Sequence, residues 1–175
     1  MYRLAETKGI RRFLAFYKVY RSSFPAEERK PFLMLIRNRR EGFTELLSIE
    51  NEEGKFRGLV ITVHFRDMVL LDYFAVVDGE RGKGIGKNVL EMVQKRYSGK
   101  RFFLEYESVN EPCGNLEQRK RRQAFYLRNH MTPMNYEVSI FGVQMAVAGY
   151  RCEISFEEYR ELYAELFAGR TVERV

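Results

Sequence analysis

The sequence predicts one α/β domain over residues 1–175, with a mixed, mostly antiparallel central sheet, flanking helices and a parallel βαβ unit. Its length and its 45% hydrophobic content are enough to bury a full core. Apolar runs typical of strands lie between segments with helical 3–4 spacing. The stretch ERGKGIGKNVL, which begins at Glu80, places a glycine-rich turn between an apolar strand and a helix.

Two helices and a hairpin are expected in the first part of the chain. Aromatic residues such as Phe13 and Tyr17 share one face of the first helix, and Pro31 suits the first turn of the second. The polar turn NEEGK then joins two strands. The expected bounds are Ile10–Tyr20 and Pro31–Arg37 for the helices, and Phe43–Glu50 and Phe56–His64 for the strands.

The middle of the chain predicts the parallel unit. Met68–Val77 is a nearly continuous apolar run, as expected of a strand that is buried on both faces. Helical spacing begins at Ile85 and ends at Ser98-Gly99, and RFFLEYE (Arg101–Glu107) is a second strand. A strand, a helix and a strand in this order give two parallel strands.

The remaining residues predict two helices around a pair of short strands. NLEQ at Asn115 and SFEE at Ser155 both resemble capping boxes, the first opening a helix to about Asn129. Tyr136–Phe141 and Gln144–Ala148 read as strands on either side of Gly142, and Gly169 fits just past the end of the last helix.

Composition excludes several classes of protein. Cys113 and Cys152 are far apart and form no CxxC pair, so a disulfide framework or a zinc site is not expected. His64 and His130 lack partners at metal-ligand spacing, so no metal is expected. No apolar run of membrane-spanning length and no signal peptide are present, which predicts a cytoplasmic protein without a membrane partner. The net charge of +6 weakly favours an anionic partner.

The glycine-rich stretch predicts an anion site. A strand that enters a helix through glycines exposes several backbone N–H groups, and the helix dipole adds positive charge there. Arg81, Lys83 and Lys87 would reinforce a site of phosphate or pyrophosphate size. The spacing fits neither a P-loop, which needs glycine where Arg81 stands, nor a dinucleotide fingerprint, which needs a small residue at Lys87.

Arg81, Gly84 and Gly86, following the strand LLDYFAVV, resemble the acetyl-CoA-binding motif of the GNAT acetyltransferase superfamily. RRQAFYLRNH resembles the second conserved segment of that family, although His130 and Met131 stand where the family has Gly-Phe. The resemblance covers residues from about 43 to 150, and the C-terminal helix is similar to a bacterial branch of the family.

The resemblance implies a coenzyme site and a catalytic acid. Loop amides would bind the pyrophosphate of coenzyme A, the amide of Val76 would stabilise the oxyanion, and Tyr126 would be the general acid. From the pattern alone, Tyr126 reads as a core residue of an amphipathic helix. The implied coenzyme-binding residues are Phe74, Ala75, Val76, Arg81, Gly82, Lys83, Gly84, Ile85, Gly86, Lys87 and Tyr126.

Carboxylates on the second strand are candidates for the general base. Glu105 and Glu107 are two residues apart, so same-face spacing predicts that both point to one side. Glu105 is the first choice for the base, with Glu107 or a water molecule as alternatives. A salt bridge to the basic helix that follows is an equally good explanation for the pair.

The predicted function is acetyl transfer from acetyl-CoA to a primary amine of a small molecule or peptide, by a monomer or homodimer. A non-catalytic module that binds or senses acetyl-CoA is the alternative. Nucleic-acid binding is less favoured, because the run Arg119–Arg122 points all round a helix rather than along one face.

Overall fold

The computed structural model describes residues 1–26, 28–77, 79, 84–110, 113–140, 142–167 and 172–175. The chain divides into two compact units. The first comprises Met1–His64 and Leu71–Ser98, and the second Phe65–Leu70 and Gly99–Val175. That the whole chain acts as a single acetyltransferase domain stays a prediction. No helix of the described residues is long and apolar enough to cross a membrane.

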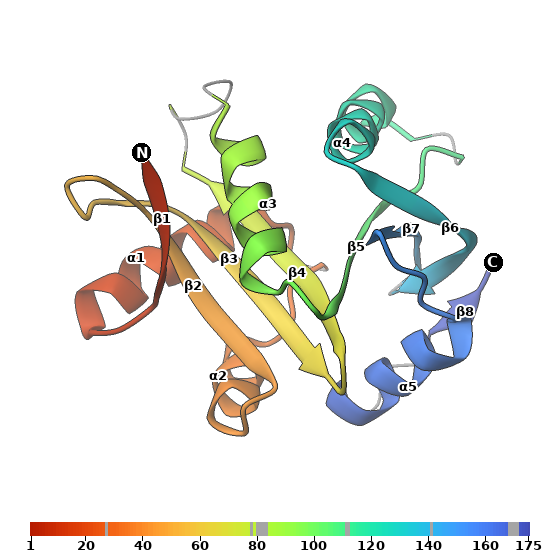
Figure 1. Ribbon diagram of the computed structural model, residues 1–175, viewed down its shortest axis with the longest axis horizontal. Coiled ribbons are helices and arrows are strands. Elements are labelled where there is room, and N and C mark those ends of the chain that lie inside the picture. Colours follow the sequence, from red (N-terminus) through yellow and green to blue (C-terminus); the bar gives the residue numbers. More distant parts are fainter. Residues whose placement is uncertain (27, 78, 80–83, 111–112, 141, 168–171) are drawn as a thin grey trace. The chain divides into compact units, whose positions relative to one another are not determined.

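The first unit is a sheet with helices on both faces. Its strands follow the order β1-β2-β3-β4, and Figure 1 shows α3 on one face with α1 and α2 on the other. The elements are β1 (Tyr2–Glu6), α1 (Ile10–Ser23), α2 (Phe32–Arg40), β2 (Thr44–Asn51), β3 (Phe56–Phe65), β4 (Met68–Val76) and α3 (Ile85–Arg96).

The core of this unit lies between the sheet and the pair α1 and α2. Phe16 and Tyr20 of α1 and Leu35 of α2 are almost fully buried. They pack on one face of the sheet, formed by Leu46, Leu59, Ile61, Tyr73 and Ala75. The aromatic face predicted for the first helix is therefore its core face for Phe13, Phe16 and Tyr20, whereas Tyr17 is 38% exposed.

The second unit holds the remaining strands in the order β5-β7-β6-β8, all paired antiparallel. The first residues of β4 belong to this unit and lie beside β5, where the Arg101 amide donates to the Asp67 carbonyl at 2.9 Å. The elements are β5 (Arg101–Glu107), α4 (Leu116–Arg128), β6 (Met131–Ile140), β7 (Val143–Tyr150), α5 (Phe156–Leu166) and β8 (Glu173–Arg174).

These strands confirm the predicted fold class. The sheet is mixed and mostly antiparallel. Its parallel pair is β4 and β5, which precede and follow α3 in the sequence. Strands β1 and β8 were not predicted, because each is short and lies near a chain end without a turn signal. The strands predicted at 136–141 and 144–148 are longer than expected, and they meet around Gly142 at a φ of 75°.

One of the two predicted capping boxes is present. Ser155 accepts from the Glu158 amide, and the Glu158 carboxylate accepts from the Ser155 amide, at the start of α5. Asn115 does precede α4, but its side chain caps nothing. The Asn115 side chain instead accepts from Arg119 and donates to Glu107, so competing polar partners remove the cap.

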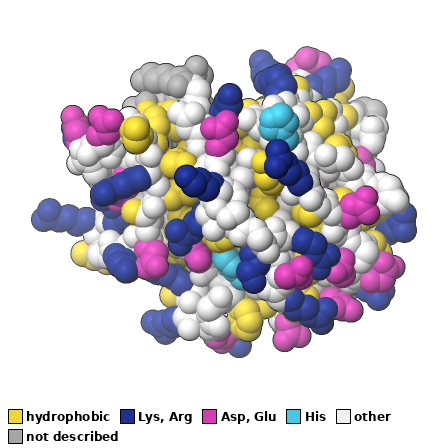
Figure 2. All heavy atoms as spheres, viewed as in Figure 1, with side chains coloured by type: hydrophobic (Ala, Val, Ile, Leu, Met, Phe, Trp, Pro, Cys, Tyr) yellow, Lys and Arg dark blue, Asp and Glu magenta, His cyan; other side chains and the backbone are white. Residues whose placement is uncertain are grey.

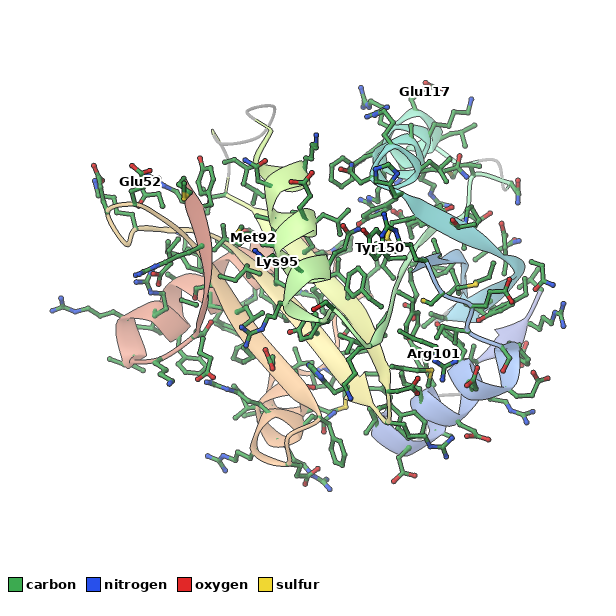
Figure 3. All side chains as sticks on the ribbon, viewed as in Figure 1. Glu52, Met92, Lys95, Arg101, Glu117 and Tyr150 are labelled. Atoms are coloured by element: carbon green, nitrogen blue, oxygen red, sulfur yellow. The ribbon has the colours of Figure 1, made fainter. Side chains whose placement is uncertain are left out.

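Arg101, labelled in Figure 3, lies at the start of β5 and binds two acidic side chains. Its guanidinium donates to both oxygens of Asp67, at 2.7 and 2.9 Å, and to Glu158 at 2.7 Å. Chiefly because of the hydrogen bond from Arg101, the pKa of Glu158 is lowered to about 2. The ion pairs of Arg101 therefore hold the N-terminus of α5 beside β5.

Gly58 on β3 is the glycine where the first unit leaves least room. A Cβ there would lie 2.3 Å from the Ala75 carbonyl oxygen and 2.9 Å from Cδ1 of Ile49. We expect Gly58→Ala to lower the free energy of unfolding by about 1–3 kcal/mol through overpacking, measured by urea denaturation. Gly114→Ala is the matched control, because no described atom lies within 4 Å of its added Cβ. Equal stability of the two variants would contradict the close packing of β3 on β4.

Candidate functional site

Helix α3 begins without a side-chain cap. Gly84 is its N-cap residue, in the left-handed region with φ 75° and ψ 0°, and it offers no side chain to the first-turn amides. Helices leave their first N–H groups without partners inside the helix, and here the dipole adds positive charge at the same point. An added Cβ at Gly84 would have no described atom within 4 Å, so the described residues leave space beside this turn. The start of α3 can thus receive an anion.

The predicted coenzyme residues after Gly84 divide into a buried and an exposed set. Ile85 is 1% exposed and holds the first turn of α3 in the core, whereas Lys87 is exposed and lies 3.8 Å from Glu91. Gly86 is half-buried between them. Arg81, Gly82 and Lys83 lie outside the described residues, so their predicted role as coenzyme ligands stays a prediction.

Strand β4 changes character halfway along its length. Met68–Leu71 are buried without a break, but from Asp72 onward the burial alternates. Tyr73 and Ala75 pack into the core with α1 and α2, whereas Phe74 and Val76 are only half-buried. The prediction that the whole strand is buried on both faces is wrong for this half. One face of the strand, directly before the glycine turn, remains partly open.

Asp72 is a functional candidate that the sequence analysis did not single out. Its side chain is 4% exposed and forms an ion pair with Lys30, whose side chain is 3% exposed, at 2.5 Å through Oδ1. Its other oxygen, Oδ2, is buried and has no hydrogen-bond partner among the described residues. A buried carboxylate oxygen without a partner is costly, so it marks a site for a ligand or water donor. The available signal was the single charge inside the apolar run MVLLDYFAV.

Two buried tyrosines fix the segment that carries Lys30. The Tyr20 hydroxyl donates to the Lys30 carbonyl, and the Tyr73 hydroxyl accepts from the Lys30 amide, both at 2.9 Å. Tyr73 also donates to the Glu28 carbonyl at 2.9 Å. Because burial raises the pKa of Tyr20 to about 12, its hydroxyl stays a neutral donor at physiological pH. The connector between α1 and α2 is therefore pinned to β4 beside Asp72.

In the second unit, Tyr126 lies on α4 with its ring against Tyr106 of β5, at a centroid distance of 5.7 Å. It is half-buried, and no described residue forms a hydrogen bond to its hydroxyl. Burial raises the pKa of Tyr126 above its usual value, so the phenol is protonated at neutral pH. A neutral hydroxyl without a protein partner is able to donate a proton to a bound molecule.

Helix α4 is the least buried of the longer helices. None of its residues is fully buried, whereas α3 and α5 each bury a complete apolar face. It ends through Asn129 into His130, which adopts a φ of 65°. The resemblance predicts glycine at this position, and His130 takes the left-handed conformation that glycine would favour. The departure from the family pattern therefore leaves the turn after α4 in place.

Glu105 and Glu107 have different partners. Glu105 accepts from the Tyr159 hydroxyl at 2.6 Å and from the Tyr163 hydroxyl at 2.9 and 3.0 Å, so both of its oxygens are bonded to α5. Glu107 instead pairs with Arg119 and Arg122 of α4. For Glu107, the salt bridge to the following basic helix is confirmed. The tyrosine partners of Glu105 come from a helix that is distant in sequence, which explains why no local pattern predicted them.

The basic run on α4 has the dispersed contacts expected of a helix surface. Arg119 and Arg122 bind Glu107, Lys120 lies 3.2 Å from Glu117, and Arg121 is exposed. Figure 2 shows charges of both signs interspersed over the face in view. Neither observation favours a continuous nucleic-acid-binding surface.

No protein-family model matches the chain, and no curated protein matches it in sequence. Solved structures do match its fold. One, from Bacteroides thetaiotaomicron and assigned to the GNAT family of acetyltransferases, superposes with a TM-score of 0.77 at 20% identity over 97% of both chains.

Two further structures are enzymes with named acceptors. The spermidine N-acetyltransferase of Vibrio cholerae, in complex with CoA and spermine, has a TM-score of 0.67 at 8% identity over 85% of this chain and 94% of its own. The ribosomal-protein-S18-alanine N-acetyltransferase of Escherichia coli has a TM-score of 0.64 at 16% identity over 90% and 97%. The present chain therefore has the fold of the GNAT acetyltransferases.

Proposed function

We propose that this protein transfers an acetyl group from acetyl-CoA to a primary amine, as a member of the GNAT superfamily. The observation that carries the proposal is the half-open face of β4, which precedes the start of α3 in a chain with a GNAT fold. A substrate with an extended thioester arm that leads into a pyrophosphate needs such a face followed by an anion site.

Binding would use backbone groups more than side chains. The first-turn amides of α3 and the left-handed turn at Gly84 would face the pyrophosphate, reinforced by Lys87 and, as predicted, Arg81 and Lys83. The half-buried face with Phe74 and Val76 would lie along the thioester arm. The amide of Val76 is the proposed donor to the negative charge that develops on the acetyl oxygen.

Proton transfer at the sulfur is assigned to Tyr126. A departing thiolate is released more readily with a proton, and the Tyr126 hydroxyl is neutral and has no described hydrogen-bond partner. Its ring packs on Tyr106, which fixes the direction of the phenol without using its proton.

Removal of a proton from the amine requires a carboxylate or a water molecule beside one. Glu105 is the base expected from sequence, but two tyrosine hydroxyls already occupy its oxygens. Asp72 keeps Oδ2 without a described partner, while Lys30 holds Oδ1 in place. We therefore favour Asp72 as the group that accepts the proton, with Glu105 as the alternative.

A non-catalytic acetyl-CoA-binding module remains the competing function. It would use the same β4 face and the same start of α3, but it would not need a free acid or base. Release of free thiol from acetyl-CoA against a panel of primary amines separates the two functions, because a binding module releases none.

The first prediction concerns coenzyme binding. Acetyl-CoA at about 100 times its dissociation constant should stabilise the protein by about 2.7 kcal/mol, measured as a thermal shift. Gly84→Val should lose this stabilisation, because its side chain would fill the space beside the turn. Gly42→Val is the matched control, since Gly42 also has a positive φ of 84° and open space around it. Both variants carry a strain of about 1–2 kcal/mol. Retained coenzyme binding in Gly84→Val would remove this turn from the site.

The second prediction concerns the acid. Tyr126→Phe removes one oxygen and keeps the ring on Tyr106, so stability and acetyl-CoA affinity should stay nearly unchanged. Turnover should fall by about 10²–10⁴-fold, the usual contribution of a positioned acid. The loss should shrink with acyl donors whose thiolate leaves readily. Turnover and coenzyme affinity are measured on the same preparation, and unchanged turnover would make Tyr126 a packing residue.

The third prediction distinguishes the two carboxylates. Asp72→Asn alone removes the carboxylate charge beside the buried Lys30, which costs about 3–5 kcal/mol, so the double variant Lys30→Met/Asp72→Asn is the test protein. It should lose about 10²-fold or more in turnover. Glu105→Gln, the comparison variant, should lose far less. If Glu105→Gln loses turnover and the double variant keeps it, Glu105 is the base.

A further inference from the structure

Helix α1 has an outer face with exposed apolar side chains. Ile10, Leu14 and Tyr17 are 74%, 62% and 38% exposed. Their spacing of i, i+4 and i+7 places them in one stripe along the helix, on a different side from the buried Phe16 and Tyr20. A stripe of this length on a surface helix is larger than the single exposed apolar residues that soluble proteins normally carry.

Helix α2 also exposes an apolar side chain. Leu33 is 83% exposed, and the preceding residue, Phe32, lies 4.8 Å from Tyr17 between ring centroids, so α1 and α2 are in contact. We call the exposed side of these two helices the α1–α2 face. Its exposed apolar residues are Ile10, Leu14, Tyr17 and Leu33, and its exposed basic residues are Arg11, Lys18, Arg21, Arg37 and Arg40.

The charge on this face is of one sign. Neither α1 nor α2 contains an Asp or Glu residue. Arg37 has an acidic partner, Glu41 at 3.0 Å, and Arg21 lies over the Tyr17 ring at 5.8 Å. Among the described residues, Arg11, Lys18 and Arg40 form no ion pair. The face therefore carries positive charge that an acidic partner could neutralise.

The surface is also hollowed at one end. A depression of about 570 Å³ lies at the start of α1, lined by residues that include Lys8, Ile10, Arg11, Arg12 and Phe56. Lys8 and Arg12 already pair with Glu6 and Glu50, each at 2.9 Å, whereas Arg11 has no acidic partner among the described residues. An acidic side chain with an apolar stem could enter the depression and pair with Arg11, whereas a flat partner would leave it unfilled.

We propose that the α1–α2 face binds an acidic amphipathic helix of a protein partner. Exposed apolar side chains accompanied by charged ones are typical of a protein interface, and the stripe on α1 has the spacing by which helices pack against each other. A second copy of this chain is disfavoured, since a two-fold contact would place the cations of one face against those of the other. Nucleic acid would cover Ile10, Leu14 and Leu33 without contacts suited to them, and a bilayer surface would not fill the depression.

The test uses two synthetic helical peptides of about 20 residues, a length sufficient for an isolated helix. Both carry the same leucine stripe, flanked by glutamate in one peptide and by lysine in the other. The acidic peptide should bind at least about tenfold more tightly in fluorescence anisotropy, and its affinity should fall as salt is raised. Equal affinity of the two peptides would overturn the proposal.

Variants locate the binding on the α1–α2 face. Lys18→Glu and Leu14→Ser should each weaken binding of the acidic peptide by about fivefold or more, because the first reverses a positive charge and the second removes exposed apolar surface. Arg160→Glu on α5 is the charge-matched control and should leave the affinity within about twofold. An equal loss in Arg160→Glu would mean that net charge alone binds the peptide.

Two measurements test the other occupants. Sedimentation velocity that shows a dimer lost in Leu14→Ser would assign the face to a second copy and overturn the proposal. Binding to vesicles of equimolar phosphatidylglycerol and phosphatidylcholine, measured by co-sedimentation, would also overturn the proposal if Lys18→Glu abolished it and the acidic peptide did not compete with the vesicles. None of these readouts depends on acetyl transfer, so the proposed function and this interface can fail separately.

Discussion

The buried ion pair between Lys30 and Asp72 is the interaction on which the arrangement of the first unit depends. Desolvation of two charges is expensive, and a pair of this kind persists only where hydrogen bonds fix the groups around it. Here Tyr20 and Tyr73 bind the backbone of Lys30, so the lysine enters the core from a connector that is itself held at three points. The connector between α1 and α2 consequently cannot move away from β4 without exposing the pair. The same geometry leaves one carboxylate oxygen of Asp72 without a described partner, which links a stabilising interaction to a candidate for chemistry.

Strand β4 shows how far sequence reasoning reaches. Its apolar composition correctly predicted a strand, because most of its residues are buried on at least one face. The pattern could not show that burial alternates after Asp72, since Phe74 and Val76 are apolar on the open face as well. Apolar residues on a partly open strand are what a site for an extended substrate requires, but in a sequence they read as ordinary core. The charge of Asp72 within that run was the one local sign that the strand differs from a core strand.

Local sequence motifs predicted where the helices start better than they predicted which side chains form contacts there. The capping box at Ser155 forms as expected, because Glu158 binds Arg101 through Oε1 and keeps Oε2 for the Ser155 amide. The similar motif at Asn115 does not cap, because Arg119 and Glu107 occupy the asparagine side chain. Likewise the carboxylates of Glu105 and Glu107 are two residues apart in sequence but bind different helices. Partners that are distant in sequence decide the role of such a residue, and a single sequence contains no direct record of them.

The ion pairs show in which part of the chain the net charge of +6 arises. In the second unit, cations lie beside acids: Arg119 and Arg122 at Glu107, and Arg101 between Asp67 and Glu158. Pairs of this kind neutralise each other and leave little field at a distance. In the first unit, α1 and α2 carry cations without any acid of their own. The excess of positive charge is therefore not a diffuse property of the chain, and it is greatest where apolar side chains are also exposed. Exposed apolar surface lowers the solubility of a free protein, and repulsion between like charges lowers its stability. Their coincidence on one face is better explained by a complementary partner than by folding alone.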